Sequence, residues 1–440
     1  MRPSYHFTPR ANWLSDPNGL VHDGKVWHLF YQYNPHGETW GHMSWGHASS
    51  ADLAMWEEHA PALVADDRQM YFSGSAVIDT DDTAGFGADA MVAIYTSTSR
   101  DDDPVQSQCL AFSRDDGAHW QDYSGNPVLD YGLADFRDPS VFWHEATGRW
   151  IMVVVLSEEN AALILVSDNL RDWRETGRIE GHTASGRIWE CPALIELPVL
   201  KTGRTHWLFK VDALHDAPGS GAFYQTGTFD GEQFVPDNKE WHVLDEGSDF
   251  YAAIPWNGPA DALGRPCWIG WMGNHSYQHD FPAREWRGGM SLPRRLALVE
   301  RGGNMMLTQE IEPSVMGLFA AAQPIAAEQS QIPLACKIDV APHYSGSLRI
   351  EGGPGKAITI GCKGDHILVE REDGDLPFLL CKRKLMGGPE VGLSIFLDSE
   401  TCEILSSDGS LAASFQHRAA GPDLILHASP PERVSVAPLL

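Results

Sequence analysis

The sequence predicts an all-β protein, a five-bladed β-propeller followed by a C-terminal β-sandwich, and three observations predict it. Short runs rich in Val, Ile, Trp, Tyr and Phe alternate with clusters of Gly, Asp, Asn and Pro, without a long amphipathic helix. A turn-plus-strand pattern recurs about every 60 residues through the first 300. Tryptophan, which occurs 16 times, is absent after residue 294. The first two observations indicate blades, and the third indicates a change of domain.

Composition sets the broad class of the protein. The 440 residues are 43% hydrophobic and 21% charged, which is enough for two domains with proper cores and excludes a disordered chain. The 32 basic and 60 acidic residues give a formal net charge of −28. This charge would repel nucleic acids and anionic membrane surfaces, so we expect neither as a partner.

The compartment is predicted from the start of the chain and from its cysteines. No charged segment followed by an apolar run is visible at the start, so we expect a cytoplasmic protein, or a secreted one if a signal has been removed. The seven cysteines are odd in number and scattered, without a CxxC pair. This pattern predicts a reduced protein without disulfides.

The repeat consists of a turn followed by an apolar strand. The positions that we take as equivalent are Trp27, Val92, Trp150, Trp207 and Trp268, at steps of 65, 58, 57 and 61 residues. Repeats of this kind are typical of propeller blades of four antiparallel strands. A large β-sandwich is the alternative, because the steps vary and exceed the usual blade length of about 40 to 50 residues.

The C-terminal part has a different composition. A Pro- and Ala-rich stretch at 312–333 precedes short strands that we expect at 348–351, 357–360, 366–370 and 393–397. We therefore divide the chain into a propeller at 1–311, a linker at 312–320 and a sandwich at 321–440.

The acidic residues suggest where a site would form. In a propeller the inner strand of each blade lines the central channel, so we expect the segments before the aligned positions to converge. Four of the five carry an acid at a position that we take as equivalent: Asp16, Asp138, Glu190 and Asp249. Acids gathered at one channel mouth drive each other's pKa values apart, which suits acid and nucleophile roles at a glycosidic bond. Any one of them alone is more simply explained as a turn or ion-pair residue.

Together these segments resemble the β-fructosidases of glycoside hydrolase family 32, the invertase, levanase and inulinase group. The resemblance is carried by Asn12–Leu20 (NWLSDPNGL), Phe30–Pro35 (FYQYNP), Trp45–Ala48 (WGHA), Phe72–Ser75 (FSGS), Phe136–Pro139 (FRDP), Trp189–Pro192 (WECP), Asp249–Ala252 (DFYA) and Trp286–Gly288 (WRG). The family is a five-bladed propeller with a C-terminal sandwich, which agrees with the prediction above.

The resemblance implies roles for three carboxylates. Asp16 would be the nucleophile that attacks the anomeric carbon of a terminal fructosyl unit, and Glu190 would protonate the leaving oxygen and then activate water. Asp138 would hold fructose hydroxyls. Retention of configuration would place the carboxyl groups of Asp16 and Glu190 roughly 5 to 5.5 Å apart. No metal or organic cofactor is implied.

The resemblance also implies a set of sugar-binding residues. They are Ser15, Gln32, Trp40, Phe72, Ser73, Arg137, Tyr251 and Trp286. Ser15 departs from the family, which usually has Asn at this position. The shorter side chain would change the hydrogen bonding around Asp16, so we expect some transfer of fructose to sugar acceptors alongside hydrolysis.

The implied activity is that of an exo-acting β-fructofuranosidase on sucrose, fructo-oligosaccharides or fructans such as levan and inulin. A fructosyltransferase that makes fructo-oligosaccharides is one alternative, and a fructan-binding propeller without chemistry is another. The sandwich is expected to brace the propeller, although it could instead mediate a homo-oligomer.

Overall fold

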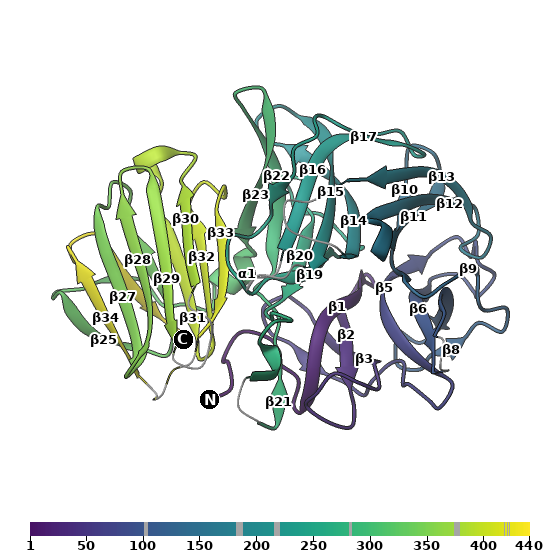
Figure 1. The fold of residues 1–440 in the computed structure, drawn as a ribbon, viewed down its shortest axis with the longest axis horizontal. Coiled ribbons are helices and arrows are strands. Elements are labelled where there is room, and N and C mark those ends of the chain that lie inside the picture. Colours follow the sequence, from purple (N-terminus) through teal and green to yellow (C-terminus); the bar gives the residue numbers. More distant parts are fainter. Residues whose placement is uncertain are drawn as a thin grey trace.

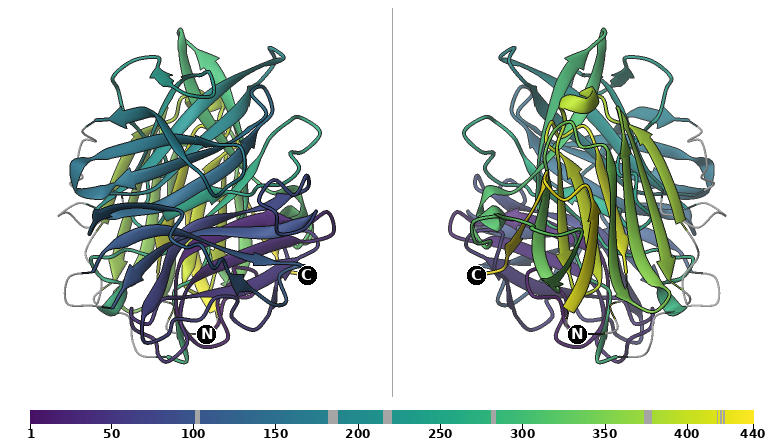
Figure 2. Two further views of the ribbon diagram at one scale, coloured as in Figure 1. Left: turned by 90° about the vertical axis from the view of Figure 1, so that its right-hand side faces the viewer. Right: turned by 90° about the vertical axis from the view of Figure 1, so that its left-hand side faces the viewer.

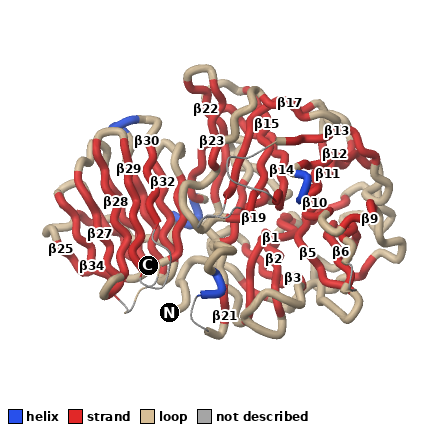
Figure 3. Tube along the Cα trace, viewed as in Figure 1, coloured by secondary structure: helices blue, strands red, loops and turns tan. Residues whose placement is uncertain are grey.

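The fold is described by a computed structural model that covers residues 1–100, 104–181, 188–214, 221–280, 284–373, 379–417, 419, 421 and 423–440. Figure 3 shows that strands make up most of the regular structure. The described helical elements are α1 (Pro313–Met316) and the 3-10 turns Ser157–Glu159, Gln278–Asp280 and Gly388–Glu390. None of the described helices is long and apolar enough to cross a membrane. The predicted all-β class is confirmed.

The first 311 residues form five antiparallel groups, which are the five blades (Figure 1). Blade 1 has β1 (Asn12–His22), β2 (Trp27–Asn34), β3 (Ser44–Ser50) and β4 (Glu57–Glu58). Blade 2 has β5 (Gln69–Asp79), β6 (Ala90–Ser99), β7 (Gln106–Ser113) and β8 (Gln121–Asp122), with β9 (Leu129–Leu133) beside β7. Blade 3 has β10 (Phe136–His144), β11 (Arg149–Leu156), β12 (Ala161–Ser167) and β13 (Arg174–Glu180).

The last two blades share one continuous sheet. Blade 4 has β14 (Ile188–Val199), β15 (Arg204–Leu214), β16 (Gly221–Phe229) and β17 (Phe234–Pro236), with β18 (His242–Val243) beside β16. Blade 5 has β19 (Tyr251–Pro255), β20 (Cys267–Trp271), β22 (Arg294–Arg301) and β23 (Asn304–Ile311). The short strand β21 (Trp286–Arg287) pairs in parallel with β1. The five aligned positions all fall on the second strand of their blade, as the repeat predicted.

The first strands of the blades form a closed ring. β1 contacts β5, β5 contacts β10, β10 contacts β14, β14 contacts β19, and β19 contacts β1. Each pair of neighbouring blades shares one hydrophobic cluster. In β11, for example, Met152 and Val154 pack toward blade 2, while Ile151 and Val153 pack toward blade 4. Because both faces are buried, these strands are continuous apolar runs rather than alternating ones.

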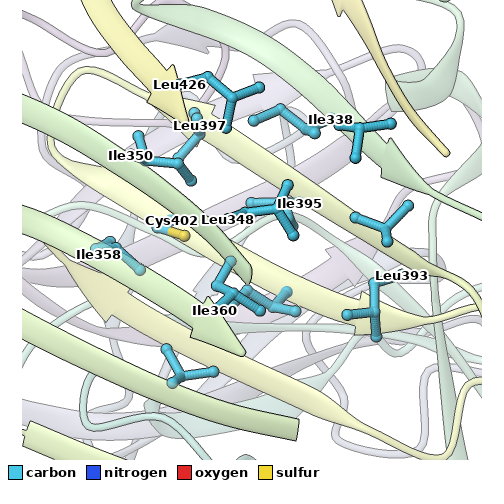
Figure 4. Packing of buried hydrophobic residues seen from close by; sticks show 14 of the residues in the cluster. Ile338, Leu348, Ile350, Ile358, Ile360, Leu393, Ile395, Leu397, Cys402 and Leu426 are labelled. Atoms are coloured by element: carbon cyan, nitrogen blue, oxygen red, sulfur yellow. The ribbon is translucent and has the colours of Figure 1, made fainter. Parts of the chain in front are cut away.

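Two six-stranded sheets form the C-terminal sandwich. One contains β24 (Gln323–Pro324), β35 (Val434–Pro438), β26 (Ala335–Val340), β31 (Leu393–Asp398), β32 (Thr401–Ser406) and β33 (Ala412–Gln416). The other contains β25 (Gln329–Pro333), β34 (Asp423–Ser429), β27 (Gly346–Gly353), β28 (Lys356–Lys363), β29 (His366–Asp373) and β30 (Leu379–Lys384). Figure 4 shows Leu348 and Ile360 of one sheet packing with Ile395 of the other. The strands expected near 348, 357, 366 and 393 are all present as β27, β28, β29 and β31.

The sandwich lies beside the propeller in Figure 1, and the two side views in Figure 2 show one domain in front of the other. A hydrophobic cluster joins them, with Leu292 and Ile311 on the propeller side and Phe396 and Leu405 on the sandwich side. β23 ends at Ile311 and β24 begins at Gln323. These bounds are compatible with the division at 1–311, 312–320 and 321–440, which we keep as a proposal.

Candidate active site

Every inner strand carries a bulge at the same place. The register with the second strand slips by one residue at Leu14–Pro17 in β1, Tyr71–Gly74 in β5, Arg137–Ser140 in β10, Glu190–Ala193 in β14 and Tyr251–Ile254 in β19. A bulge bends its strand and turns side chains out of the regular alternation. The five bulges therefore form a ring of redirected side chains around the axis.

The three predicted catalytic carboxylates all lie in this ring, but not at equivalent positions. Glu190 is the first residue of its bulge, Asp138 the second and Asp16 the third. The expectation of strict equivalence is therefore wrong. The bulges have the same place in each blade, and each strand presents a different residue of its bulge to the common centre.

Left-handed backbone supports this arrangement in three blades. The second bulge residues Asp138, Cys191 and Ala252 have φ values of 63°, 47° and 53°. Residues other than glycine rarely adopt this region, and such strain is found where a functional geometry is held by its surroundings.

Asp16 is bound by neighbours from two other blades. The hydroxyl of Ser73 donates a hydrogen bond of 2.8 Å to Asp16 Oδ2, and the thiol of Cys191 lies 3.8 Å from the same oxygen. Burial raises the pKa of Asp16, and the nearby charge of Glu190 raises it further, while His275 and Ser73 oppose the rise. Ser73 of β5 and Cys191 of β14 thus both reach Asp16, although β1 and β14 are far apart in sequence.

Asp138 is the most deeply buried of the three carboxylates. The backbone N–H of Cys191 donates a hydrogen bond of 2.9 Å to its Oδ2, and its own N–H donates to Thr96 Oγ1 at 2.9 Å. Burial raises the pKa of Asp138 to about 7; Arg137 opposes this rise and Glu190 adds to it. Near neutral pH a buried carboxyl with this pKa can accept a hydrogen bond from a sugar hydroxyl when ionised, or donate one to it when protonated.

Glu190 is partly open to solvent and has two polar partners. The hydroxyl of Tyr251 donates to its Oε2 at 2.5 Å, and Arg137 Nη2 lies 3.3 Å from its Oε1. Burial and the negative charge of Glu190 raise the pKa of Tyr251 well above its usual value, so the phenol remains a neutral donor. The side chain of Glu190 is 19% exposed, which allows proton exchange with water.

The structure brings most of the predicted sugar-binding residues to this centre. Arg137, Ser73 and Tyr251 contact the carboxylates directly. Ser15, buried in the β1 bulge, directly precedes Asp16. Gln32 donates to the carbonyl of Tyr71 at 3.0 Å, at the start of the β5 bulge.

The three remaining predicted residues are aromatic. Trp40 and Phe72 form an edge-to-face pair with ring centroids 6.0 Å apart. Trp286 borders a separate cavity together with Gln278 and Glu400, and the guanidinium of Arg2 lies 3.9 Å from its ring centroid. The sugar-binding role of Trp286 stays a prediction.

Sequence reasoning missed a buried ion pair behind the site. Lys210 donates to the carbonyl of Cys191 at 2.9 Å and to the carboxylate of Asp212, which lies opposite Glu190 in the β14–β15 ladder. Burial raises the pKa of Asp212 to about 7 against the effect of Lys210. The signal that could have indicated this pair is the presence of two charged residues, Lys210 and Asp212, at alternate positions of the otherwise apolar strand β15.

The expectation that Asp249 lines the channel is wrong. It lies two residues before the bulge of β19 and is fully buried, with Oδ2 paired to Arg371 of the sandwich at 3.2 Å. Its hydrogen-bonding capacity is used at the domain junction rather than at the axis.

Known proteins are similar to this chain in sequence. Residues 6–309 match the model of the glycosyl hydrolases family 32 N-terminal domain. The chain is 44% identical over 309 residues to the levanase of Bacillus subtilis, covering 68% of this chain and 45% of the levanase. It is 40% identical over 348 residues to an extracellular exo-inulinase of Aspergillus awamori, covering 70% and 64% of the two chains. The chain thus spans about half the length of the levanase and somewhat under two thirds of the exo-inulinase.

Solved structures match over the whole chain. The crystal structure of exo-inulinase from Aspergillus awamori matches with a TM-score of 0.89 at 32% identity, covering 100% of this chain and 98% of that one. The structure of fructofuranosidase from Schwanniomyces occidentalis complexed with fructose matches with a TM-score of 0.82 at 28% identity, covering 100% and 98%. The agreement includes both the propeller and the sandwich. The chain therefore belongs to glycosyl hydrolase family 32.

Proposed function

We propose that this protein is a retaining, exo-acting β-fructofuranosidase that releases terminal fructose from sucrose, fructo-oligosaccharides or fructans. One observation carries the proposal: the thiol of Cys191, the residue directly after Glu190, lies 3.8 Å from the Asp16 carboxylate, and Asp16 and Glu190 are each held by a different set of partners. Two carboxylates in distinct environments are the requirement for acid and nucleophile roles.

In the first step Asp16 attacks the anomeric carbon of the fructosyl unit while the bond to the leaving oxygen breaks. Glu190 gives its proton to that oxygen, so the leaving sugar departs as an alcohol. The Ser73 hydrogen bond favours the ionised form of Asp16 that this attack needs. The products of the step are a fructosyl ester of Asp16 and an ionised Glu190.

In the second step water replaces Asp16. Glu190 takes a proton from the water. The oxygen of the water bonds to the anomeric carbon, and the bond between that carbon and Asp16 breaks. Tyr251 and Arg137 hold the Glu190 carboxylate in place between the two proton transfers. Two inversions at one carbon give net retention.

The propeller is closely packed beside Asp138. A cavity lined by Asp138 and Cys191 has a volume of about 40 Å³, enough for water but not for a sugar ring. Asn257 also lines this cavity and donates to the carbonyls of Ala76 and Val141, each at 2.8 Å, which ties three blades together. This cavity therefore has no room for a sugar unit, and the support for exo action is the similarity to the exo-inulinase of Aspergillus awamori.

Product analysis on sucrose, inulin and levan in parallel tests this proposal. We expect fructose as the first and sole small product from the polymers, and glucose with fructose from sucrose. Internal oligosaccharides from inulin or levan would contradict exo action. Binding of fructo-oligosaccharide without release of fructose would instead support the binding-module alternative.

Transfer to sugar acceptors is a second activity that Ser15 favours. Because Ser15 is buried directly before Asp16, its side chain affects the surroundings of the fructosyl ester. We expect kestose-type trisaccharides in concentrated sucrose, and fewer of them in Ser15→Asn. Equimolar glucose and fructose at every sucrose concentration would remove this activity from the proposal.

A further inference from the structure

The interface between the domains contains a buried polar network that reaches the active site. Its centre is Arg371 of β29, whose guanidinium is 1% exposed and lies 3.2 Å from Asp249 Oδ2. The same guanidinium donates to the hydroxyl of Tyr277 at 3.2 Å and to the carbonyl of Gln416 at 3.1 Å. A buried arginine in such a setting requires partners of fixed geometry.

Asp249 gathers donors from both domains. The hydroxyl of Tyr277 donates to its Oδ1 at 2.7 Å, and the backbone N–H of Gln416 donates to its Oδ2 at 3.0 Å. The N–H of Asp249 itself donates to the carbonyl of Ser414 at 3.1 Å. The approach is so close that a Cβ at Gly247 would lie 2.0 Å from the Ser414 oxygen. The chain before β19 is thus fixed against β33 of the sandwich.

This anchor lies two residues before Tyr251. Tyr251 begins β19, and its hydroxyl holds the carboxylate of Glu190. The short strand has its bulge immediately after this residue, at Tyr251–Ile254. The position of the Tyr251 phenol therefore depends on the segment that Asp249 and Arg371 hold from outside the propeller.

A second contact of the network supports the loop that covers Tyr251. Gln416 Nε2 donates to the carbonyl of Met272 at 2.5 Å and to Gln278 Oε1 at 2.9 Å. Between these anchors lies His275, whose ring meets that of Tyr251 edge-on at 4.8 Å. The sandwich thus holds both the strand that carries Tyr251 and the loop packed upon it.

We propose that Arg371 is a positioning residue for the acid/base carboxyl: through Asp249 it fixes the start of β19 and thereby the Tyr251 hydroxyl against Glu190. This inference rests on the proposed role of Glu190. It gives the sandwich a part in the reaction, because a residue of β29 sets the position of the Tyr251 hydroxyl at the bulge ring.

The test compares Arg371→Lys with a matched variant, Arg294→Lys. Arg294 is equally buried and also joins the domains, through Ser414 Oγ at 2.7 Å and the carboxylate of Glu403, but it begins β22 rather than β19. Tyr251→Phe serves as the reference for loss of the hydrogen bond to Glu190. The measurements are Tm, kcat, KM and the pH profile of kcat/KM on sucrose.

We expect Arg371→Lys to lower kcat about tenfold with little change in KM, as one misplaced hydrogen bond does. The alkaline limb of its pH profile should move to higher pH, as in Tyr251→Phe, because a donor to the carboxylate form of Glu190 is weakened. The double variant that combines Arg371→Lys with Tyr251→Phe should have a kcat no lower than that of Tyr251→Phe alone. Arg294→Lys should lower Tm without moving the limb.

An unchanged limb in Arg371→Lys, or the same shift in Arg294→Lys, would overturn the inference and leave a purely structural brace. Should Arg371→Lys fail to fold, Tyr277→Phe takes its place, because it removes one donor to Asp249 and keeps the ring. Glu190→Gln distinguishes a failure of the proposed function from a failure of the positioning role of Arg371. If Glu190→Gln is active, the proposed function fails; if it is inactive and the limb does not move, only the positioning role fails.

Discussion

The hydroxyl of Ser73 donates a hydrogen bond of 2.8 Å to the carboxylate of Asp16, across 57 residues of sequence and from the neighbouring blade. Burial and the charge of Glu190 both favour protonated Asp16, and Ser73 is among the groups that oppose them. The bond therefore maintains the ionised nucleophile in a setting that disfavours it.

Ser73→Ala should weaken the nucleophile. Without the donor, the pKa of Asp16 rises further, so the acid limb of kcat/KM moves to higher pH. A hydrogen bond to a charged group contributes about 1.5 to 3 kcal/mol, so we expect kcat to fall by about 10- to 100-fold. The control is Ser75→Ala in the same strand, whose hydroxyl binds the carbonyl of Pro139. An acid limb that shifts equally in both variants would contradict the specific role of Ser73.

Trp40 should contribute to binding rather than to chemistry. Trp40 is 51% exposed and its ring meets that of Phe72 in the β5 bulge edge-on, which leaves apolar surface available to a sugar. We expect Trp40→Ala to raise KM about tenfold with kcat nearly unchanged, because the contact is equal in ground and transition states. Val235→Ala, on an outer strand at a position that is 60% exposed, should change neither constant. A fall in kcat at constant KM would contradict this assignment.

The stability of the protein should depend on the charge of His6. Burial opposes that charge, but hydrogen bonds and charges from Asp398 and Glu403 prevail and raise the pKa of His6 to about 9. The pKa of His6 in the folded protein thus exceeds its unfolded value of about 6.5. The charged imidazole therefore contributes its full stabilisation of the fold below about pH 6.5, and this contribution is lost as pH rises through about 9.

Urea unfolding at pH 6 and pH 9.5 measures this dependence. We expect His6→Gln to lose on the order of 2 kcal/mol at the lower pH and less at the higher one. The half-exposed His366 provides the control variant, His366→Gln. Equal losses for His6→Gln at both pH values would show that the imidazole is not charged in the folded protein.

Much of the fold could be predicted because its signals are local. The second strand of each blade begins at an apolar run with a turn before it, and the packing of both faces against neighbouring blades produces that run. The sandwich strands likewise show in the alternation of their side chains, as in β26, whose inward Cys336, Ile338 and Val340 join its core.

The site could be predicted in part, since the sequence motifs mark the acids but not their geometry. A bulge leaves no composition signal, so the different places of Asp16, Asp138 and Glu190 within it are visible only when the strands pair. Asp249 shares the pattern of those acids, yet its partner Arg371 is over 100 residues away in another domain. Long-range pairing of this kind is fixed by tertiary packing and not by local sequence.

In the proposed mechanism Asp16 and Glu190 perform the chemistry together. The most direct measurement is the rate of fructose release from sucrose by Asp16→Ala and Glu190→Ala, with the folded state verified by thermal unfolding. We predict that Glu190→Ala loses at least about 10²- to 10⁴-fold in kcat and that Asp16→Ala loses as much or more, each with near-native Tm. Turnover comparable to that of the unaltered protein in either folded variant would show that the substituted residue does not have the proposed catalytic role.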